Sequence, residues 1–300
     1  MKYEKIILGS NKNVTLTTYI LDDFLNTPKP SIVICPGGGF LDCSPREGEC
    51  VAMHFAALGF HTFVLNYSTQ KNTSYKGVLP QALRDLGEAM CLIRKRAGEW
   101  NVDTDKIAVL GFSAGGQLAA LYGNLWNSAR LDTIGIPEER RPNAIIVSYG
   151  LIDMWEHRKM FEWIMQDDKK TVDMQIVTGT SRELRIRNFW KQADIAQFGK
   201  CPPLQKEIDS VDAIRYIGSN TPPTFLWHTF EDEIVSPVQA LHYAEALYRN
   251  QIPCEVHIFE RGRHGLSLAN ETSAEKKEQA VPHVAHWTQL AAEWLEELFQ

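Results

Sequence analysis

The sequence lacks the features that mark several large classes of protein. It contains no run of about 18 apolar residues, the length that a membrane-spanning helix needs, and no apolar stretch after Met1 long enough for a signal peptide. Its six cysteines form no C-x-x-C pair and have no spacing typical of a metal site. We therefore expect a soluble, reduced, cytoplasmic protein without a bound metal ion.

Positive charge is not in excess, and the phosphate-binding glycine motifs are missing. The 31 lysines and arginines are outnumbered by 37 aspartates and glutamates, which gives a formal net charge of −6. This balance offers no electrostatic reason to expect binding to nucleic acid or to an anionic membrane. Neither G-x-G-x-x-G nor G-x-x-x-x-G-K-S/T occurs, so the sequence predicts no nucleotide cofactor.

Short apolar runs alternate with segments of helical periodicity along most of the 300 residues. Continuous apolar runs are typical of strands that are covered on both faces. Their alternation with helices favours a mainly parallel central sheet flanked by helices, in a single α/β domain spanning 1–300. The predicted strands are 30–36, 60–67, 107–110, 143–150, 224–229 and 254–259, and the predicted helices are 46–58, 79–98, one that opens at 117, 237–249 and 281–299.

Two regions depart from this alternation. Residues 4–8 and 14–21 alternate in polarity around a turn-rich break, which predicts an N-terminal antiparallel hairpin. Residues 151–222 hold no buried-strand run but many aromatic and charged residues, and a structureless loop of that length is improbable in a compact domain. We interpret them as a helical insertion that forms a cap or lid. The alternatives are that this segment pads the sheet edge or forms a homodimer contact.

The strand predicted at 107–110 runs into Gly111-Phe-Ser-Ala-Gly115, a match to G-x-S-x-G that precedes a helix. In a strand–turn–helix this pattern is a nucleophile elbow, whose sharp turn lifts the serine hydroxyl clear of the sheet. The start of the helix also favours negative charge. Ser113 is therefore the candidate nucleophile, and the alternative is a strand-to-helix junction with an incidental serine.

The loop Pro36-Gly-Gly-Gly-Phe40 directly follows a predicted strand. Consecutive glycines free the backbone to turn several amides towards one point. Such a loop completes an oxyanion hole together with the amide after the nucleophile. Gly38, Gly39 and Ala114 are the expected donors, and a phosphate-cradling loop is the alternative.

Two further loops at strand ends carry the residues that a serine nucleophile needs. His264 lies between glycine-containing segments after the last strand, where it can approach the site without steric obstruction. A carboxylate after the 224–229 strand can orient that histidine, and Glu231, Asp232 and Glu233 compete for this role, with Asp153 as an outside candidate. Other histidines suit packing or surface positions better: His228, His257, His283 and His286.

Four motifs, taken in chain order, resemble one known family. They are Pro36–Phe40, the segment 105–116, Thr221–Thr229 with Asp232, and the loop Arg261-Gly-Arg-His264-Gly. The resemblance is to the bacterial acetyl-esterase and acetyl-xylan-esterase-like branch of the α/β hydrolases, related to the prolyl-oligopeptidase-like and hormone-sensitive-lipase-like esterases. It implies the α/β-hydrolase fold, and Asp232 as the acid, four residues after the histidine of the His-Thr motif.

The resemblance also implies an activity, the hydrolysis of esters by a serine enzyme that needs no cofactor. We expect a carboxylesterase with Ser113, His264 and Asp232 as its catalytic residues, acting on short-chain acetyl esters of sugars or xylo-oligosaccharides. Related hydrolases on the same scaffold are the alternatives: a peptidase, a formamidase or a lactonase. A non-catalytic ligand-binding homologue is a further alternative from another class, although all three catalytic positions are filled.

Overall fold

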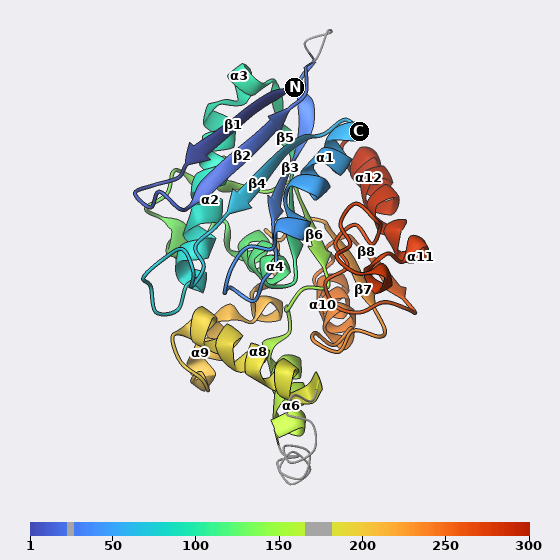
Figure 1. The fold of residues 1–300 in the computed structure, drawn as a ribbon. Helices are drawn as coiled ribbons and strands as arrows, with labels where there is room; N and C mark the ends of the chain where they lie inside the picture. Colours follow the sequence, from blue (N-terminus) through green and yellow to red (C-terminus); the bar gives the residue numbers. More distant parts are fainter. Residues whose placement is uncertain (23–26, 166–181) are drawn as a thin grey trace.

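The computed structural model describes residues 1–22, 27–165 and 182–300, and a central sheet organises them (Figure 1). Within these residues the sheet has eight strands in the order β1-β2-β4-β3-β5-β6-β7-β8. The strands are β1 (Lys2–Ile7), β2 (Thr15–Ile20), β3 (Lys29–Cys35), β4 (His61–Asn66), β5 (Val102–Phe112), β6 (Ala144–Ser148), β7 (Thr224–Thr229) and β8 (Cys254–Phe259).

Strand directions follow the predicted pattern. β1 pairs with β2, and β2 with β4, in antiparallel fashion, which confirms the N-terminal hairpin. Every other neighbouring pair, from β4 through β8, is parallel. In the middle of the sheet Ile34 of β3 pairs with Leu110 of β5, and both side chains are fully buried. The carboxyl ends of β3, β5, β6, β7 and β8 therefore share one edge, where function concentrates in α/β sheets.

Two apolar cores lie on the two faces of the sheet. Alternate residues of a strand point to opposite faces, so Val109 joins one core while Leu110 joins the other. The first core also takes apolar residues from α2 (Leu79–Lys95), α4 (Ala114–Leu125) and α10 (Val238–Arg249). The second takes them from α1 (Glu49–Ala57) and α12 (Trp287–Leu298).

Several predicted helix bounds are wrong, and each error has a local cause. The helix expected over 46–58 is a 3₁₀ turn, η1 (Pro45–Glu47), followed by α1, because Gly48 has non-helical torsions between them. The helix expected to open at 117 begins at Ala114, since the elbow turn is a single residue, Ser113. Two longer predictions are each split by a break: α2 is followed by α3 (Ala97–Trp100), and α11 (Pro282–Ala285) precedes α12.

Helices fill the described part of the segment between β6 and β7. They are α6 (Met154–Met165), α8 (Arg182–Phe198), α9 (Gln205–Val211) and the 3₁₀ turn η3 (Ala213–Tyr216), while residues 166–181 lie outside the described residues. In Figure 1 the three α-helices form a group of their own below the sheet. Shorter elements precede β6: η2 (Ala129–Leu131) and α5 (Pro137–Arg140); η4 (Lys277–Gln279) precedes α11.

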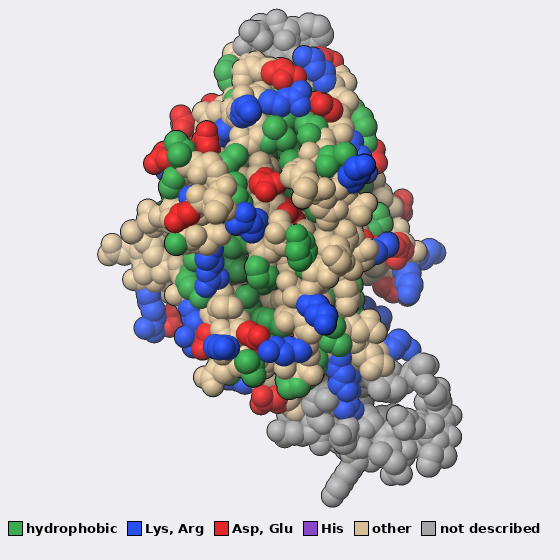
Figure 2. All heavy atoms as spheres, turned by 90° about the vertical axis from the view of Figure 1, so that its left-hand side faces the viewer, with side chains coloured by type: hydrophobic (Ala, Val, Ile, Leu, Met, Phe, Trp, Pro, Cys, Tyr) green, Lys and Arg blue, Asp and Glu red, His purple; other side chains and the backbone are tan. Residues whose placement is uncertain are grey.

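Charges of both signs are interspersed on the face of the molecule drawn in Figure 2, with small apolar groups between them. This mixture is typical of a solvated protein surface. Among the described helices, none combines the length and apolar character needed to cross a membrane.

Candidate active site

Ser113 occupies the single-residue turn between β5 and α4. Its torsions, φ 52° and ψ −115°, lie in a region that non-glycine residues rarely adopt. Backbone hydrogen bonds hold the turn, because the Ser113 amide donates to Ser148 O (3.0 Å) and the Ser113 carbonyl accepts from Gln117 N (3.0 Å). The structure therefore has the strand–turn–helix geometry that the G-x-S-x-G pattern predicts.

The two glycines of that pattern are required by close backbone approach. A Cβ on Gly111 would lie 2.0 Å from Gly115 O, and a Cβ on Gly115 would lie 2.0 Å from Cys35 O. Both distances are far below van der Waals contact. A side chain at Gly111 would clash within the elbow, and one at Gly115 would force the elbow away from β3. The glycines thus bring Ser113 next to the loop that follows β3.

Ser113, His264 and Asp232 form a continuous chain of hydrogen bonds. Nε2 of His264 lies 2.8 Å from Ser113 Oγ, and Nδ1 of His264 lies 2.7 Å from Asp232 Oδ2. A carboxylate only accepts, so Nδ1 carries the ring proton and leaves Nε2 free to accept the proton of the serine hydroxyl. The three residues come from the loops after β5, β8 and β7, which are far apart in sequence.

Of the three candidate carboxylates in the loop after β7, Asp232 is the one that contacts His264. Asp232 is buried, and its other oxygen, Oδ1, accepts the amides of Ile234 and Val235, both at 2.9 Å. Glu231 instead accepts the Gly262 amide (2.9 Å), which ties its loop to the histidine loop. Asp153, the less favoured candidate for the acid, instead pairs with His242 through Oδ2 and Nδ1 (2.7 Å).

His228, for which the sequence predicts a packing or surface role, lies beside the site and forms a hydrogen bond with Asp232. It is buried in β7, and its Nε2–H is shared between Asp232 Oδ2 (3.0 Å) and Val235 O (2.9 Å). Because Val235 O can only accept, His228 acts as a donor towards Asp232. The spacing of four residues between the histidine and the aspartate was the available signal.

The electrostatics of the site favour a charged Asp232 and a basic His264. Burial opposes ionisation of Asp232, but the neighbouring His264 and His228 outweigh it and hold the pKa of Asp232 well below its ordinary value. Burial also opposes the charge on His264, yet the Asp232 carboxylate raises the pKa of His264 above its ordinary value of 6.5, with a further contribution from Glu47.

The glycine loop presents two amides beside the elbow. Gly38 and Gly39 have φ +125° and +63°, conformations that glycine tolerates best, and a Cβ on Gly38 would overlap Asp42 O at 2.1 Å. In the part of the chain that the structure describes, the amides of Gly38, Gly39 and Ala114 donate to no backbone or side-chain acceptor. The Gly37 amide, by contrast, is taken by the Glu47 carboxylate at 2.8 Å.

Helix α8 packs against this loop. A Cβ on Gly39 would lie 2.9 Å from Cζ of Phe189 and 3.5 Å from Cβ of Ala193. The same helix is fixed to the start of α2, because the Val78 amide donates to Ala196 O (2.9 Å). The helical segment therefore places an aromatic ring directly beside the glycine loop.

Comparison with known proteins assigns the chain to a family. Residues 20–247 match the BD-FAE family, over three quarters of the chain. The chain belongs to the BD-FAE family. Over 262 residues it is 30% identical to the endo-1,4-beta-xylanase B of Butyrivibrio fibrisolvens, a match that covers 85% of this chain and 35% of that protein. The chain spans about a third to a half of the length of the curated relatives it matches.

Solved structures similar to this BD-FAE chain match it almost end to end. The carboxylesterase Cest-2923 of Lactobacillus plantarum is 29% identical with a TM-score of 0.76, covering 99% of this chain and 98% of that one. An acetyl ester-xyloside bifunctional hydrolase from Caldicellulosiruptor lactoaceticus is 31% identical with a TM-score of 0.74, covering 98% and 96%. These likenesses and the sheet order confirm the predicted α/β-hydrolase fold.

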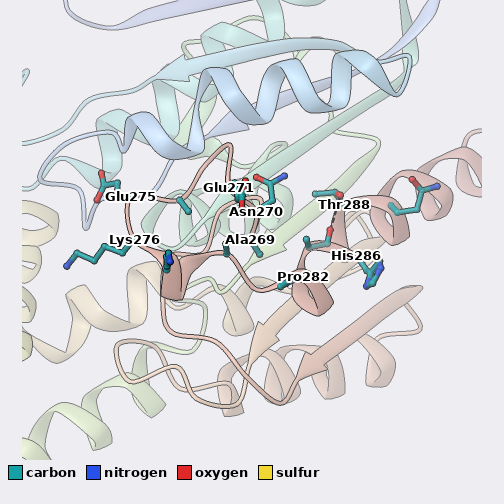
Figure 3. A pocket seen from close by; sticks show the side chains of 13 residues that line it. Ala269, Asn270, Glu271, Glu275, Lys276, Pro282, His286 and Thr288 are labelled. Atoms are coloured by element: carbon teal, nitrogen blue, oxygen red, sulfur yellow. Dashed lines mark hydrogen bonds between the residues drawn. The ribbon is translucent and has the colours of Figure 1, made fainter.

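A surface pocket of the BD-FAE chain lies apart from the hydrogen-bonded chain of Ser113, His264 and Asp232. It has a volume of about 840 Å³ and is formed by residues between 269 and 289, the segment that follows the histidine loop (Figure 3). Asn270, Lys276 and His286 are among its lining side chains, but none of the three hydrogen-bonded residues is. The candidate site is therefore identified by the contacts of Ser113 rather than by this hollow.

Proposed function

We propose that this chain is a serine carboxylesterase that hydrolyses short-chain acetyl esters, of acetylated sugars or xylo-oligosaccharides. The observation that carries the proposal is the chain of hydrogen bonds from Ser113 through His264 to Asp232, at 2.8 and 2.7 Å. A nucleophile, its base and an orienting acid within hydrogen-bond distance are the arrangement that acyl transfer needs.

The first half of the proposed reaction forms an acyl-enzyme. Ser113 Oγ attacks the ester carbonyl carbon while its proton passes to Nε2 of His264. The tetrahedral intermediate then collapses, the bond to the alcohol oxygen breaks, and His264 gives its proton to the departing alcohol. Asp232 keeps the ring of His264 in the tautomer that accepts the serine proton, and it stabilises the imidazolium while it lasts.

The second half returns the enzyme to its starting state. A water molecule gives a proton to His264 as its oxygen attacks the acyl carbon, and the bond to Ser113 Oγ then breaks. Ser113 regains a proton from His264, and the free acid leaves. In both halves the amides of Ala114 and of Gly38 or Gly39 stabilise the oxyanion, a role supported by their lack of other acceptors among the described residues.

The proposed substrate class draws on relatives and on α8. The names of two similar proteins, a xylanase and an acetyl ester-xyloside hydrolase, point to decorated xylan fragments. Phe189 and Ala193 lie against the glycine loop and narrow the space beside the proposed oxyanion hole, which favours a small acyl group.

A substrate panel tests this proposal. Purified protein is assayed on acetylated xylo-oligosaccharides, an aryl acetate, an aryl octanoate and a peptide anilide. We expect the highest kcat/KM on the acetyl esters and release of acetate from the oligosaccharides. Preference for the octanoate or the anilide would favour a lipase or a peptidase, and inactivity on every substrate would favour a ligand-binding homologue.

A further inference from the structure

A buried carboxylate, Glu47, lies where the loops of the site meet. The Glu47 residue is 4% exposed, and both of its carboxylate oxygens accept hydrogen bonds. Oε2 accepts the Gly37 amide at 2.8 Å, directly before the two glycines with free amides. Oε1 accepts the hydroxyl of Tyr149 at 2.6 Å. One side chain therefore links the glycine loop to the end of β6.

Tyr149 extends this link to the histidine loop. Its hydroxyl oxygen accepts a hydrogen bond from the Ser267 amide at 2.8 Å, and its hydroxyl hydrogen is donated to Glu47. Its ring lies edge-on to the ring of His264, with centroids 5.1 Å apart and an interplanar angle of 70°. Tyr149 is itself held with a positive φ of 41°, an uncommon backbone conformation. The hydroxyl and the ring thus both contact the loop that carries the candidate base.

The neighbouring residue, Arg46, binds the same loop through different atoms. Its Nη1 donates to Gly265 O (2.9 Å), the residue after His264, and its Nε donates to Ser273 O (2.6 Å). Its carbonyl oxygen accepts the hydroxyl of Ser267 at 2.5 Å. The two consecutive residues of η1 therefore contact both loops that flank Ser113.

A buried carboxylate is an unfavourable choice for a position that needs only packing. Burial raises the pKa of Glu47, and only the hydrogen bonds from Tyr149 and Gly37, with smaller effects of His264 and Arg46, act in the opposite direction. An apolar side chain of similar volume would avoid this desolvation penalty. Titratable groups whose pKa is shifted by burial are found preferentially at functional sites.

We propose that Glu47 is a positioning residue that fixes the distance between the glycine loop and His264. Its carboxylate holds the Gly37 amide directly and the Ser267 amide through Tyr149, so the oxyanion donors and the base keep one geometry relative to Ser113. This inference rests on the proposed esterase function. Acyl transfer requires donors and base to be aligned within about 0.5 Å, and a displacement of about 1 Å can lower the rate by a factor of about 100.

Glu47→Gln tests this role with little change of volume. Both partners of the carboxylate are donors, so either orientation of the new amide places its NH₂ group against Gly37 N–H or the Tyr149 hydroxyl. We expect kcat on an aryl acetate to fall about 30-fold, between 10- and 100-fold, with KM within about threefold of wild type. The inhibition constant of a boronic acid, which forms a tetrahedral adduct on Ser113, should rise by the same factor as kcat falls.

Tyr149→Phe is the second variant, because it keeps the carboxylate and removes only the link to Ser267. As in Glu47→Gln, kcat should fall and the boronate inhibition constant should rise, but by a smaller factor. Tyr149→Phe also tests the positioning role if Glu47→Gln does not fold. Titration with a fluorophosphonate counts the competent sites in each preparation, so every kcat is expressed per competent site.

Asp85→Asn is the matched control for loss of a buried charge. Asp85 is also a buried carboxylate, and it accepts one backbone amide, that of Ser68 (2.7 Å), and one side-chain donor, Gln81 (2.9 Å). The control should lower the melting temperature but leave kcat per site and the boronate constant unchanged.

Two results would overturn the positioning role while leaving the esterase proposal intact. One is wild-type kcat per site and boronate affinity in Glu47→Gln and Tyr149→Phe. The other is a loss of activity that disappears once it is expressed per competent site, which would make Glu47 purely structural. An inactive wild-type protein would instead overturn the proposed function itself, and the inference with it.

Discussion

The carboxyl edge of the sheet and the helices between β6 and β7 are built on different principles. At the sheet edge, short loops place polar groups against one another: Asp232 alone accepts hydrogen bonds from two histidines and two backbone amides. Helix α8 instead brings apolar side chains, Phe189 and Ala193, to the same glycine loop. In the proposed function, the sheet edge would carry out the reaction, and the apolar groups of α8 would influence which ester fits.

Two helices of the segment between β6 and β7 are joined by contacts of their own. Arg158 of α6 and Asp194 of α8 form a buried, two-pronged ion pair, one bond of which is 2.9 Å. His157 and Trp190 pack edge-on across the same two helices with centroids 5.1 Å apart. These contacts join α6 to α8 and do not reach Ser113. Substitutions in the two regions should therefore have separable effects.

The largest expected effect comes from the nucleophile at the sheet edge. Ser113→Ala removes the attacking oxygen, and kcat on an aryl acetate should fall by a factor of about 10⁶, as for other serine triads. Circular dichroism and the melting temperature should stay close to wild type, because the serine side chain is only partly buried. Turnover within tenfold of wild type would remove Ser113 from the mechanism.

The second effect is the pH dependence of kcat/KM. Protonated His264 cannot accept the serine proton, and its pKa lies above 6.5 because the Asp232 carboxylate outweighs burial and Glu47 adds to it. Activity should be full above that raised pKa and fall about tenfold for each pH unit below it. The midpoint of the acid limb should therefore lie above pH 6.5.

Asp232→Asn is the check on this assignment. It removes the charge that raises the pKa of His264, so the midpoint should move to lower pH while kcat drops by a factor of about 10⁴. A wild-type profile that stays flat down to pH 5 would argue against His264 as the base.

A third effect should arise in the helices and alter selectivity rather than the rate of the reaction. Phe189→Ala opens the space beside Gly39, so the ratio of octanoate to acetate kcat/KM should rise roughly tenfold, with kcat on the acetate within about threefold.

Phe161→Ala is the matched control for this change. Phe161 is a buried ring of α6 that packs on Trp190, with centroids 5.5 Å apart. Its truncation should lower stability by about 3 kcal/mol without changing the acyl-length ratio. An octanoate-to-acetate ratio of kcat/KM that is equal in wild type and Phe189→Ala would show that Phe189 of α8 does not influence acyl-chain selectivity.

The smallest effect concerns the acid stability of the helical segment. Burial, with the nearby Arg158, lowers the pKa of His157 to about 3. The unfolded chain binds this proton near pH 6.5, so the stabilisation is complete above that value and is lost as pH falls towards 3. Between pH 7 and about pH 5.7 the free energy of unfolding should decrease by about 1 kcal/mol more in wild type than in His157→Gln. Equal decreases in urea titrations would show that His157 is not buried in its neutral form.

Much of the fold could be predicted because its signals are local. Apolar runs located the strands of the parallel sheet, and the match to G-x-S-x-G placed Ser113 on a turn. The order of motifs at strand ends predicted that His264 and a carboxylate of the loop after β7 lie beside it, since parallel strands end at one edge. The choice of Asp232 among three acidic residues came from the family resemblance.

The positioning contacts could not be predicted in the same way. Glu47 stands in a charged stretch, Arg46-Glu-Gly-Glu49, whose polarity indicates an exposed helix start. It is buried only because loops from three distant parts of the chain converge on it. The sequence predicts Tyr149 only as the end of an apolar strand, and no spacing in it indicates the hydrogen bond with Ser267. Such long-range convergence leaves no periodic pattern in a single sequence.

Fluorophosphonate labelling followed by peptide mass analysis asks whether Ser113 is the activated nucleophile. A fluorophosphonate forms a covalent adduct with an activated serine, and its fluoride leaves as the bond to oxygen forms. We expect one adduct per chain, on Ser113, which should be absent in Ser113→Ala and form much more slowly in Asp232→Asn. Labelling at another residue, or no labelling of folded wild-type protein, would contradict it.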